Sequence, residues 1–472
     1  MGIKHIKSAS RRRKTESRDS AAVSPLMREF AGYIAGAARK PLPAEASEAC
    51  KHHILDTLAA MVSGSRLLPG KKAIEYIKLL GGKREACVPG SRILTNVVNA
   101  ALAGGMLAHA DETDDGHAAT LTHPGCAVVP AALAMAESRG AGGAAFLRAV
   151  ALGYDVCIRT SRALGAYDFF AGGHSTDSYC PVFGAAAAAG SIAGLDAGQV
   201  RHMLSYTAQQ ASGISYYARD TDHIEKAFDV GGMPARNGVY AATMVAAGMT
   251  GVDDAFSGER NFFFACGPTS KPAELLRRLG KTFEITNTGI KKWSVGNPAQ
   301  APLDSLSALI KAHRLKPADV ETIVIRIYHQ GANTVGNRDM PAICMQYLAA
   351  IMLIDGTVTF ASAHDESRMR DPRVQDIRRR VELYGDDDLD RAMPVRQGIV
   401  ELKLRDGRQL RHHTRQVRGT MRNPLTRQEV EEKSHSLLGP VLGPLQARNL
   451  INAVWRMEKI GDLREIRPML QT

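Results

Sequence analysis

The chain has 472 residues, 44% hydrophobic and 23% charged, with a formal net charge of +12. This length is enough for about two globular domains. No stretch approaches the roughly 18 consecutive apolar residues of a membrane-spanning helix, so we expect a soluble protein with no membrane partner.

The positive charge is partly local. Residues 1–22 carry seven Lys or Arg against two acidic residues and supply +5 of the total. They lack an apolar segment of the signal-peptide kind and predict a disordered basic tail. The other basic residues are not interleaved with aromatic side chains, which argues against a nucleic-acid partner and suits a small anionic substrate. The seven cysteines are scattered without C-x-x-C spacing, which predicts a cytoplasmic protein with no zinc site.

The first half of the chain predicts helices rich in Ala and Gly. Small residues in helix interiors allow close approach of helix axes and favour a many-helix core. Several predicted helices are followed by glycines that suit a left-handed helix end, at 64, 140, 165, 194 and 248. The helical periodicity covers residues 45–63, 96–108, 128–138, 146–164, 183–193, 199–210 and 235–247.

The pattern changes near Thr282. Val320–Tyr328 alternates as a strand, and 399–404 with 409–415 flank the hairpin signal at 405–408. Helices are predicted at 305–312, 342–353 and 374–383, and a capping box at Thr426 starts a return to helix that includes 448–458. We therefore predict a mainly α protein, in which a helical domain of residues 23–281 and 415–472 carries an inserted α+β lid at 282–414.

The segment His109–His123, HADETDDGHAATLTH, concentrates four carboxylates and three imidazoles in fifteen residues. Carboxylates held close to one another shift their pKa values, and His titrates near neutral pH, so such a cluster suits proton transfer. A solvated loop is the alternative, because Asp, Thr and Gly also favour turns. The apolar helices predicted on both sides favour a fixed, catalytic loop.

Several motifs occur in an order that resembles the MmgE/PrpD family. They are HADETDDGH, THPG, GYDVCIRTSRALG, GGHSTDSYCPVFGAAAAAGSIAGLD, EKAFDVGGMPARNGVYAATMVAAGMTG, KKWSVGNPAQ and MQYLAAIMLIDG, and they span roughly residues 25 to 465. That family includes 2-methylcitrate dehydratases, cis-aconitate decarboxylases and iminodisuccinate epimerases. The resemblance implies a helical domain with an α+β lid, a site between them, a homodimer and no organic cofactor.

The resemblance also implies roles for individual residues. Glu112 and His123 correspond to the catalytic base and acid, and Lys226 and Lys291 to cations that hold substrate carboxylates and stabilise developing negative charge. His174 and Tyr347 correspond to hydrogen-bond donors. Asp111 and Asp114, beside Glu112, are also expected to contact substrate.

Four positions depart from the family pattern. Glu112 replaces an Asp, Gly116 a Thr, Asp229 a His, and Gly296 the His of the decarboxylases. Because catalysis is sensitive to displacements of about an ångström, we expect a substrate other than 2-methylcitrate, and decarboxylation is disfavoured.

We therefore expect a dehydratase-like lyase that uses neither metal nor cofactor, acting on a small di- or tricarboxylic acid. Epimerisation and decarboxylation are alternatives on the same fold, and a non-catalytic carboxylate-binding protein is one of another class. A magnesium-diphosphate enzyme is a further alternative, because DETDD resembles an acidic metal motif; it requires a second acidic motif, for which Asp386–Asp388 is the candidate.

Overall fold

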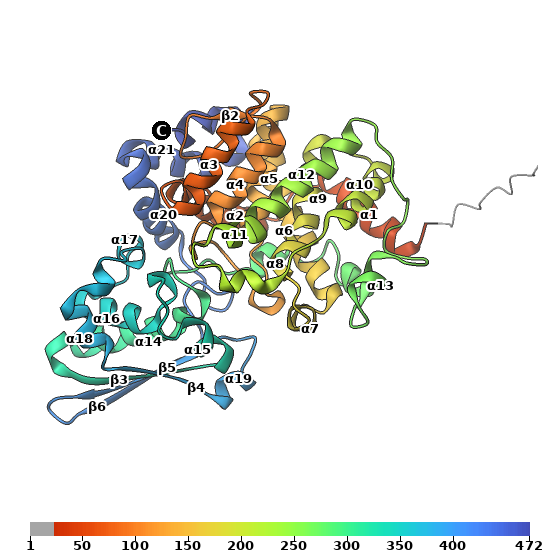
Figure 1. Ribbon diagram of the computed structural model, residues 1–472. Helices are drawn as coiled ribbons and strands as arrows, with labels where there is room; N and C mark the ends of the chain where they lie inside the picture. The colour runs from red at the N-terminus through yellow and green to blue at the C-terminus, as the bar shows by residue number, and fades with distance from the viewer. Residues whose placement is uncertain (1–22) are drawn as a thin grey trace, which may run out of the picture.

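In this computed structural model, which describes residues 23–472, the chain forms a large helical domain and a smaller α+β domain (Figure 1). The basic tail predicted at 1–22 lies outside the described residues. The mainly α fold class with a small α+β part is confirmed.

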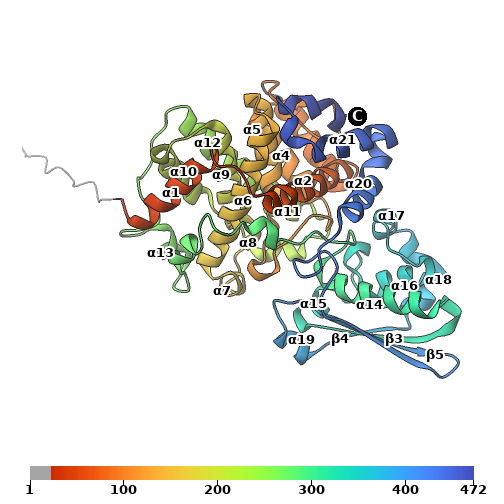
Figure 2. The same cartoon turned by 180° about the vertical axis from the view of Figure 1, so that it is seen from behind.

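The helical domain takes its helices from both ends of the chain, and α20 and α21 pack beside α2 (Figure 2). A small antiparallel pair, β1 (Ala86–Cys87) and β2 (Leu94–Thr95), lies at its edge. Its helices are α1 (Pro25–Ala37), α2 (Ala44–Gly64), α3 (Leu68–Leu80), α4 (Val97–Ala108), α5 (Gly125–Arg139), α6 (Gly143–Leu164), α7 (Ala166–Ala171), α8 (Thr176–Tyr179), α9 (Pro181–Ala193), α10 (Ala197–Gln210), α11 (Ile224–Ala227), α12 (Met233–Ala246), α13 (Phe262–Cys266), α20 (Arg427–Leu442), α21 (Pro444–Trp455) and α22 (Arg467–Leu470).

Small residues bring the helices of this domain into close contact. Helix α9 consists mostly of alanine and glycine, is buried over most of its length, and packs against α5, α6 and α12. Gly105 of α4 meets Gly231 of the π-helical turn Phe228–Gly232, and a Cβ at either position would overlap the other's carbonyl oxygen. This contact places the end of α4 beside α11, whose Lys226 precedes the turn.

The α+β domain is a four-stranded sheet with helices on one face (Figure 1). The strand order is β4-β3-β5-β6, with β3 parallel to β4 and antiparallel to β5. Helices α14 and α16 pack on the sheet and bury a core of Ile, Leu, Met and Val. Its elements are α14 (Asn297–His313), β3 (Val320–Ile327), α15 (His329–Val335), α16 (Met345–Asp355), α17 (Phe360–Ala363), α18 (Pro372–Arg378), β4 (Val381–Gly385), α19 (Asp387–Arg391), β5 (Gly398–Leu404) and β6 (Gln409–Thr414).

Most predicted elements are present with ends shifted by a few residues, and the Thr426 capping box and the hairpin are confirmed. The predicted helix 374–383 is wrong in its second half, because the helix ends at Arg378 and Val381–Gly385 pairs with β3. Gly64 remains helical, whereas Gly140, Gly165, Gly194 and Gly248 have positive φ as predicted. Helices α1 and α3 were not predicted.

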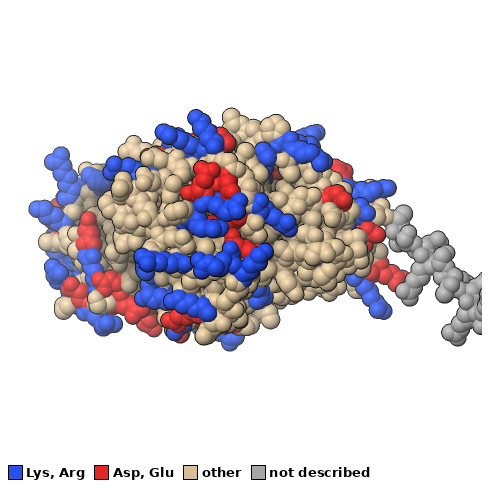
Figure 3. Space-filling model, turned by 90° about the horizontal axis from the view of Figure 1, so that it is seen from above, with Lys and Arg blue, Asp and Glu red and all other residues tan. Residues whose placement is uncertain are grey.

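On the face shown in Figure 3, basic side chains alternate with acidic ones and with uncharged surface. Among the described residues, no helix is long and apolar enough to cross a membrane. All seven cysteines are free, and all but the partly exposed Cys266 are buried.

Candidate active site

The acidic segment after α4 is buried and folded back between α4 and α5. His109, Asp114 and Asp115 have no exposed surface, and Glu112 is 6% exposed. Asp115 accepts hydrogen bonds from the Tyr154 hydroxyl of α6 (2.5 Å) and the Gly125 amide of α5 (3.0 Å), which fixes the segment to these two helices. The solvated-loop alternative is therefore wrong.

Glu112 is held between two lysines from distant parts of the chain. Lys226 donates a hydrogen bond to its carboxylate, and Lys291 Nζ lies 3.9 Å from Glu112 Oε2 and 2.8 Å from the Glu112 carbonyl oxygen. Burial alone would raise the pKa of Glu112, but Lys226 and Lys291 hold that pKa well below its usual value. Glu112 is therefore an anion between two ammonium groups, and the structure brings the predicted site residues Lys226 and Lys291 together beside it.

The neighbouring carboxylates are each paired with a histidine. Asp114 lies 3.0 Å from His109 Nδ1 and 3.6 Å from Lys291 Nζ. Asp111 lies 3.0 Å from Nε2 of His364, which follows α17 of the α+β domain. Burial opposes ionisation of Asp111, but its hydrogen bonds from His364 and Thr113 lower its pKa. Asp111 and Asp114 thus hold the loop and the α+β domain together around Glu112.

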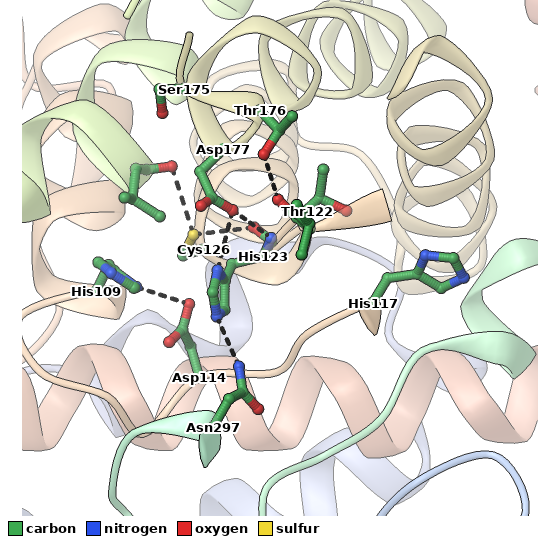
Figure 4. A network of polar contacts seen from close by, with 12 residues as sticks. His109, Asp114, His117, Thr122, His123, Cys126, Ser175, Thr176, Asp177 and Asn297 are labelled. Carbon is green, nitrogen blue, oxygen red and sulfur yellow. Dashed lines mark hydrogen bonds and ion pairs between the residues drawn. The ribbon is translucent and has the colours of Figure 1, made fainter. Parts of the chain in front are cut away.

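His123 is oriented by Asp177 of α8 (Figure 4). Asp177 Oδ1 lies 2.9 Å from His123 Nδ1 and accepts the His123 amide proton at 2.9 Å. The other ring nitrogen, Nε2, lies 3.3 Å from Asn297 at the start of α14. Burial lowers the pKa of His123, but the charges of Asp177 and Asp114 outweigh this and raise it. These charges favour the protonated form of His123, and its Nε2 points toward Asn297 of the α+β domain.

Two predicted site residues lie elsewhere. Tyr347 has no exposed surface, and its hydroxyl donates to the Ser362 carbonyl (2.6 Å) within the α+β core. His174 stacks on Phe169, with ring centroids 4.3 Å apart, and makes an edge contact with Tyr179. Neither side chain contacts Glu112, Lys226 or His123, because helix α16 turns Tyr347 inward and the aromatic pair holds His174 aside.

Two groups of side chains in this cluster could hold a metal ion: His109, Asp114 and Cys126, and His109, Glu112 and His223. Ligand atoms of His109, Glu112 and His223 lie within 4.8 Å of one another. Burial and the charge of Lys226 lower the pKa of His223 to about 3, so this imidazole is neutral. A cation here would, however, face the ammonium groups that already neutralise Glu112, which opposes its binding.

The magnesium-diphosphate alternative fails on geometry. Asp386 caps its own helix, α19, by accepting the amide protons of Asp388 and Leu389. This helix lies at the edge of the α+β domain (Figure 1), where Asp387 and Asp388 are solvent-exposed. No second acidic motif faces the DETDD segment in the part of the chain that the structure describes.

Comparison with known proteins identifies the family. A family model described as the MmgE/PrpD N-terminal domain matches residues 28–275. A second, described as the MmgE/PrpD C-terminal domain, matches residues 293–459. The chain belongs to the MmgE/PrpD family.

Curated relatives align over nearly the whole chain. The cis-aconitate decarboxylase-like protein oryM of Aspergillus oryzae is 23% identical, covering 95% of this chain and 98% of its own length. The cis-aconitate decarboxylase of Homo sapiens is 26% identical, with 89% of each chain covered. That of Mus musculus is 25% identical, covering 94% of this chain and 92% of its own.

In this MmgE/PrpD protein, a cavity of about 420 Å³ lies beside the carboxylate cluster. It is bounded by the end of the acidic segment, by the start of α14, and by the two segments that connect the domains. Lys291 and Asn297 line it and also contact Glu112 and His123, respectively. Lys291 and Asn297 thus lie between the cavity and the proton-transfer groups.

Sequence reasoning missed several groups that complete the site. Asp177 lies in a segment with few charges, and His364 lies beside Asp365, Glu366 and Arg368 in a run of mixed charge that indicates no site. Only their three-dimensional pairing with His123 and Asp111 reveals them. Asp229, which replaces the family His, accepts a 2.6 Å hydrogen bond from Ser175, and burial raises its pKa to about 6.

Proposed function

We propose that this protein is a lyase that removes a proton from the carbon beside a carboxylate of a small di- or tricarboxylic acid, with neither metal nor organic cofactor. The observation that carries the proposal is the presence, in one buried cluster, of the anionic Glu112 and of His123 with its raised pKa. Surroundings that push two titratable groups toward opposite charges distinguish a base from an acid.

Lys226 and Lys291 are proposed to bind the substrate carboxylate. The ammonium groups that now neutralise Glu112 would be shared with the arriving anion, which weakens their hold on Glu112. The pKa of Glu112 then rises toward the range in which a carboxylate accepts a proton efficiently. The same lysines stabilise the enolate-like charge that forms when the proton leaves.

His123 is proposed to complete the reaction as the acid. Glu112 takes the proton from the α carbon, a carbon–carbon double bond forms, and the hydroxyl on the adjacent carbon leaves with the proton of His123 Nε2 as water. Asp177 fixes Nδ1 as the nitrogen that faces away from substrate and keeps the ring charged. Dehydration requires both a base and an acid at one site. Among lyases we therefore favour a hydro-lyase. The substitution of Asp by Glu112 supports a substrate other than 2-methylcitrate.

Decarboxylation is the second candidate, because three similar proteins are named cis-aconitate decarboxylases or are likened to them. In that reaction a carbon–carbon bond breaks, carbon dioxide leaves, and the acid protonates carbon. Gly296 lacks the His of the decarboxylases, which weighs against this candidate. Epimerisation would need protonation of the same carbon from the opposite side.

Proton NMR in deuterated water tests the proposal with a panel of citrate, 2-methylcitrate, cis-aconitate, iminodisuccinate and tartrate. We expect one acid to take up deuterium at the α carbon and to lose water, equally with and without EDTA. Loss of carbon dioxide instead would select the second candidate. Binding without exchange by any acid would indicate a non-catalytic protein, and activity that chelation removes and zinc or magnesium restores would contradict the metal-free mechanism.

A further inference from the structure

The interdomain cavity is larger and more cationic than the proposed reaction requires. Its 420 Å³ falls in the range of about 300–1,000 Å³ typical of sites for drug-sized ligands. Five cationic side chains line it, and no Asp or Glu does: they are Arg162, Lys291, Arg396, Arg418 and Arg422. A small dicarboxylate bound at Lys226 and Lys291 would leave most of this charge unused.

Two of these arginines have no partner of their own. Arg162 is paired with Glu284, and Arg418 with Glu429. Arg396 and Arg422, in contrast, form no ion pair or side-chain hydrogen bond with any described residue, and Nε of Arg396 is buried without an acceptor. A buried donor without an acceptor is costly. An anion between these guanidinium groups would remove that cost and bind through charge-assisted hydrogen bonds.

The helix start on the cavity wall adds to the positive potential. Helix α14 has 17 residues, its N-cap Gly296 provides no side-chain acceptor, and Asn297 and Gln300 of its first turn line the cavity. Pro298 has no amide proton and the Ala299 amide donates to the Gly296 carbonyl, so this helix start favours a nearby anion through its dipole.

The cavity also has an apolar wall and lies next to the proton-transfer groups. Ile290, Val395, Val417 and Met421 line it between the cations. Gly116, where the family pattern has Thr, separates it from His123: a Cβ at this position would lie 3.5 Å from His123 Cδ2 and 3.6 Å from Asn297 Nδ2. A larger side chain here would contact His123 and Asn297 and take up space between them and the cavity.

We propose that the cavity binds a second anionic group of the substrate, carried on an apolar arm and held by Arg396 and Arg422. This inference rests on the proposed function for the position of the first carboxylate, at Lys226 and Lys291. It makes the substrate an elongated acid with anionic groups at both ends rather than a compact tricarboxylate.

Calorimetric titration with three probes tests the proposal without turnover. Suberate has two carboxylates on an eight-carbon chain, octanoate has the same length with one, and succinate is too short to span the cavity. We expect suberate to bind at least about tenfold more tightly than either of the others, the gain of a charge-assisted contact. Arg396→Gln and Arg422→Gln should each remove most of this advantage, and Gly116→Thr should reduce it. Arg405→Gln, at the exposed and unpaired tip of the β5–β6 hairpin, is the control that should keep it.

Equal binding of suberate and octanoate, or an advantage that survives Arg396→Gln and Arg422→Gln, would overturn the inference. Inorganic phosphate that binds the protein without competing with suberate would assign the cavity to a separate anion and would overturn it as well. If suberate binds as expected but neither the acids of the NMR panel nor 2-hydroxysuberate, an elongated hydroxy diacid, exchanges its α proton, the proposed function fails while the cavity assignment stands.

Discussion

At the scale of single residues, the site depends on two charges that burial alone would suppress. Desolvation opposes the ionisation of Glu112 and of His123, and in each case the direction of the pKa is set by oppositely charged neighbours. The charges of Glu112 and His123 are therefore set by their neighbours in the fold and not by their residue types alone. Replacing a charged neighbour should therefore change the activity even where Glu112 and His123 are both kept.

Asp177→Asn tests this for His123. The variant loses the charge that raises the pKa of His123, so the imidazole should lose its proton at lower pH than in the wild type. Since the acid form is required, the alkaline limb of the profile of kcat/KM against pH should move to lower pH, with a loss on the order of a hundredfold at neutral pH. An unchanged alkaline limb would show that His123 is not the acid.

Lys226→Met tests the carboxylate clamp. Removing an ammonium group that contacts the ground state and the transition state alike should raise KM strongly while kcat falls less. Lys72→Met, which removes an exposed lysine of α3, is the matched control and should leave both constants unchanged. A fall in kcat with KM unchanged would assign Lys226 to proton transfer.

At the scale of elements, glycine contacts bring the catalytic segments together. The backbones of α4 and the turn after α11 touch at Gly105 and Gly231, and this contact places Glu112 within reach of Lys226, 114 residues away. The π-helical turn Phe228–Gly232 belongs to the same junction. The geometry of the site is thus set by helix packing that contains none of its polar groups.

Gly105→Ala should therefore destabilise the fold. The new Cβ would overlap the Gly231 carbonyl, so the helices must separate, at a cost of about 1–3 kcal/mol or more in the free energy of unfolding. Gly32→Ala in α1, with no atom within 4 Å of the added Cβ, is the control and should be neutral or stabilising by about 0.5–1 kcal/mol. Urea denaturation measures both, and equal stability of the two variants would contradict the packing argument.

Elements that depend on local signals could be predicted from the sequence, and those that depend on distant partners could not. Helices such as α6 and the β5–β6 hairpin follow local signals, and their positions were found to within a few residues. Strand β4 was missed because its parallel pairing with β3 lies across more than 50 residues of chain. The acidic segment was evident from its charge density. Its partners Asp177 and His364 were not, because a single Asp or His in an ordinary segment carries no pattern.

At the scale of the whole molecule, helix α20 near the C-terminus contacts the acidic segment of the site. Lys433 of α20 pairs with the buried Asp56 of α2 at 2.6 Å and donates to the Thr113 carbonyl at 3.0 Å. The acidic segment is thus held from the helical domain by Lys433 and from the α+β domain by His364. Both domains must be folded for Glu112 to occupy its place.

Lys433→Met should leave the charge of Asp56 buried without a partner and lower the free energy of unfolding by about 3–5 kcal/mol. Burial already raises the pKa of Asp56 in the folded protein. A carboxyl with a raised pKa binds its proton more tightly when folded, so stability falls as the pH rises through that pKa. The loss should therefore be smaller at about pH 5 than at about pH 8. Adding Asp56→Asn should restore much of the stability, and a double variant as unstable as the single one would contradict the pairing.

The central claim is that Glu112 takes the α proton and that His123 acts after it, and solvent exchange separates the two steps. The measurement is deuterium uptake at the α carbon of the substrate, followed by NMR alongside product formation, for the wild type, Glu112→Gln and His123→Gln. We predict that His123→Gln still exchanges the proton while elimination is lost, and that Glu112→Gln does neither. Exchange at the wild-type rate in Glu112→Gln would contradict the assignment of the base.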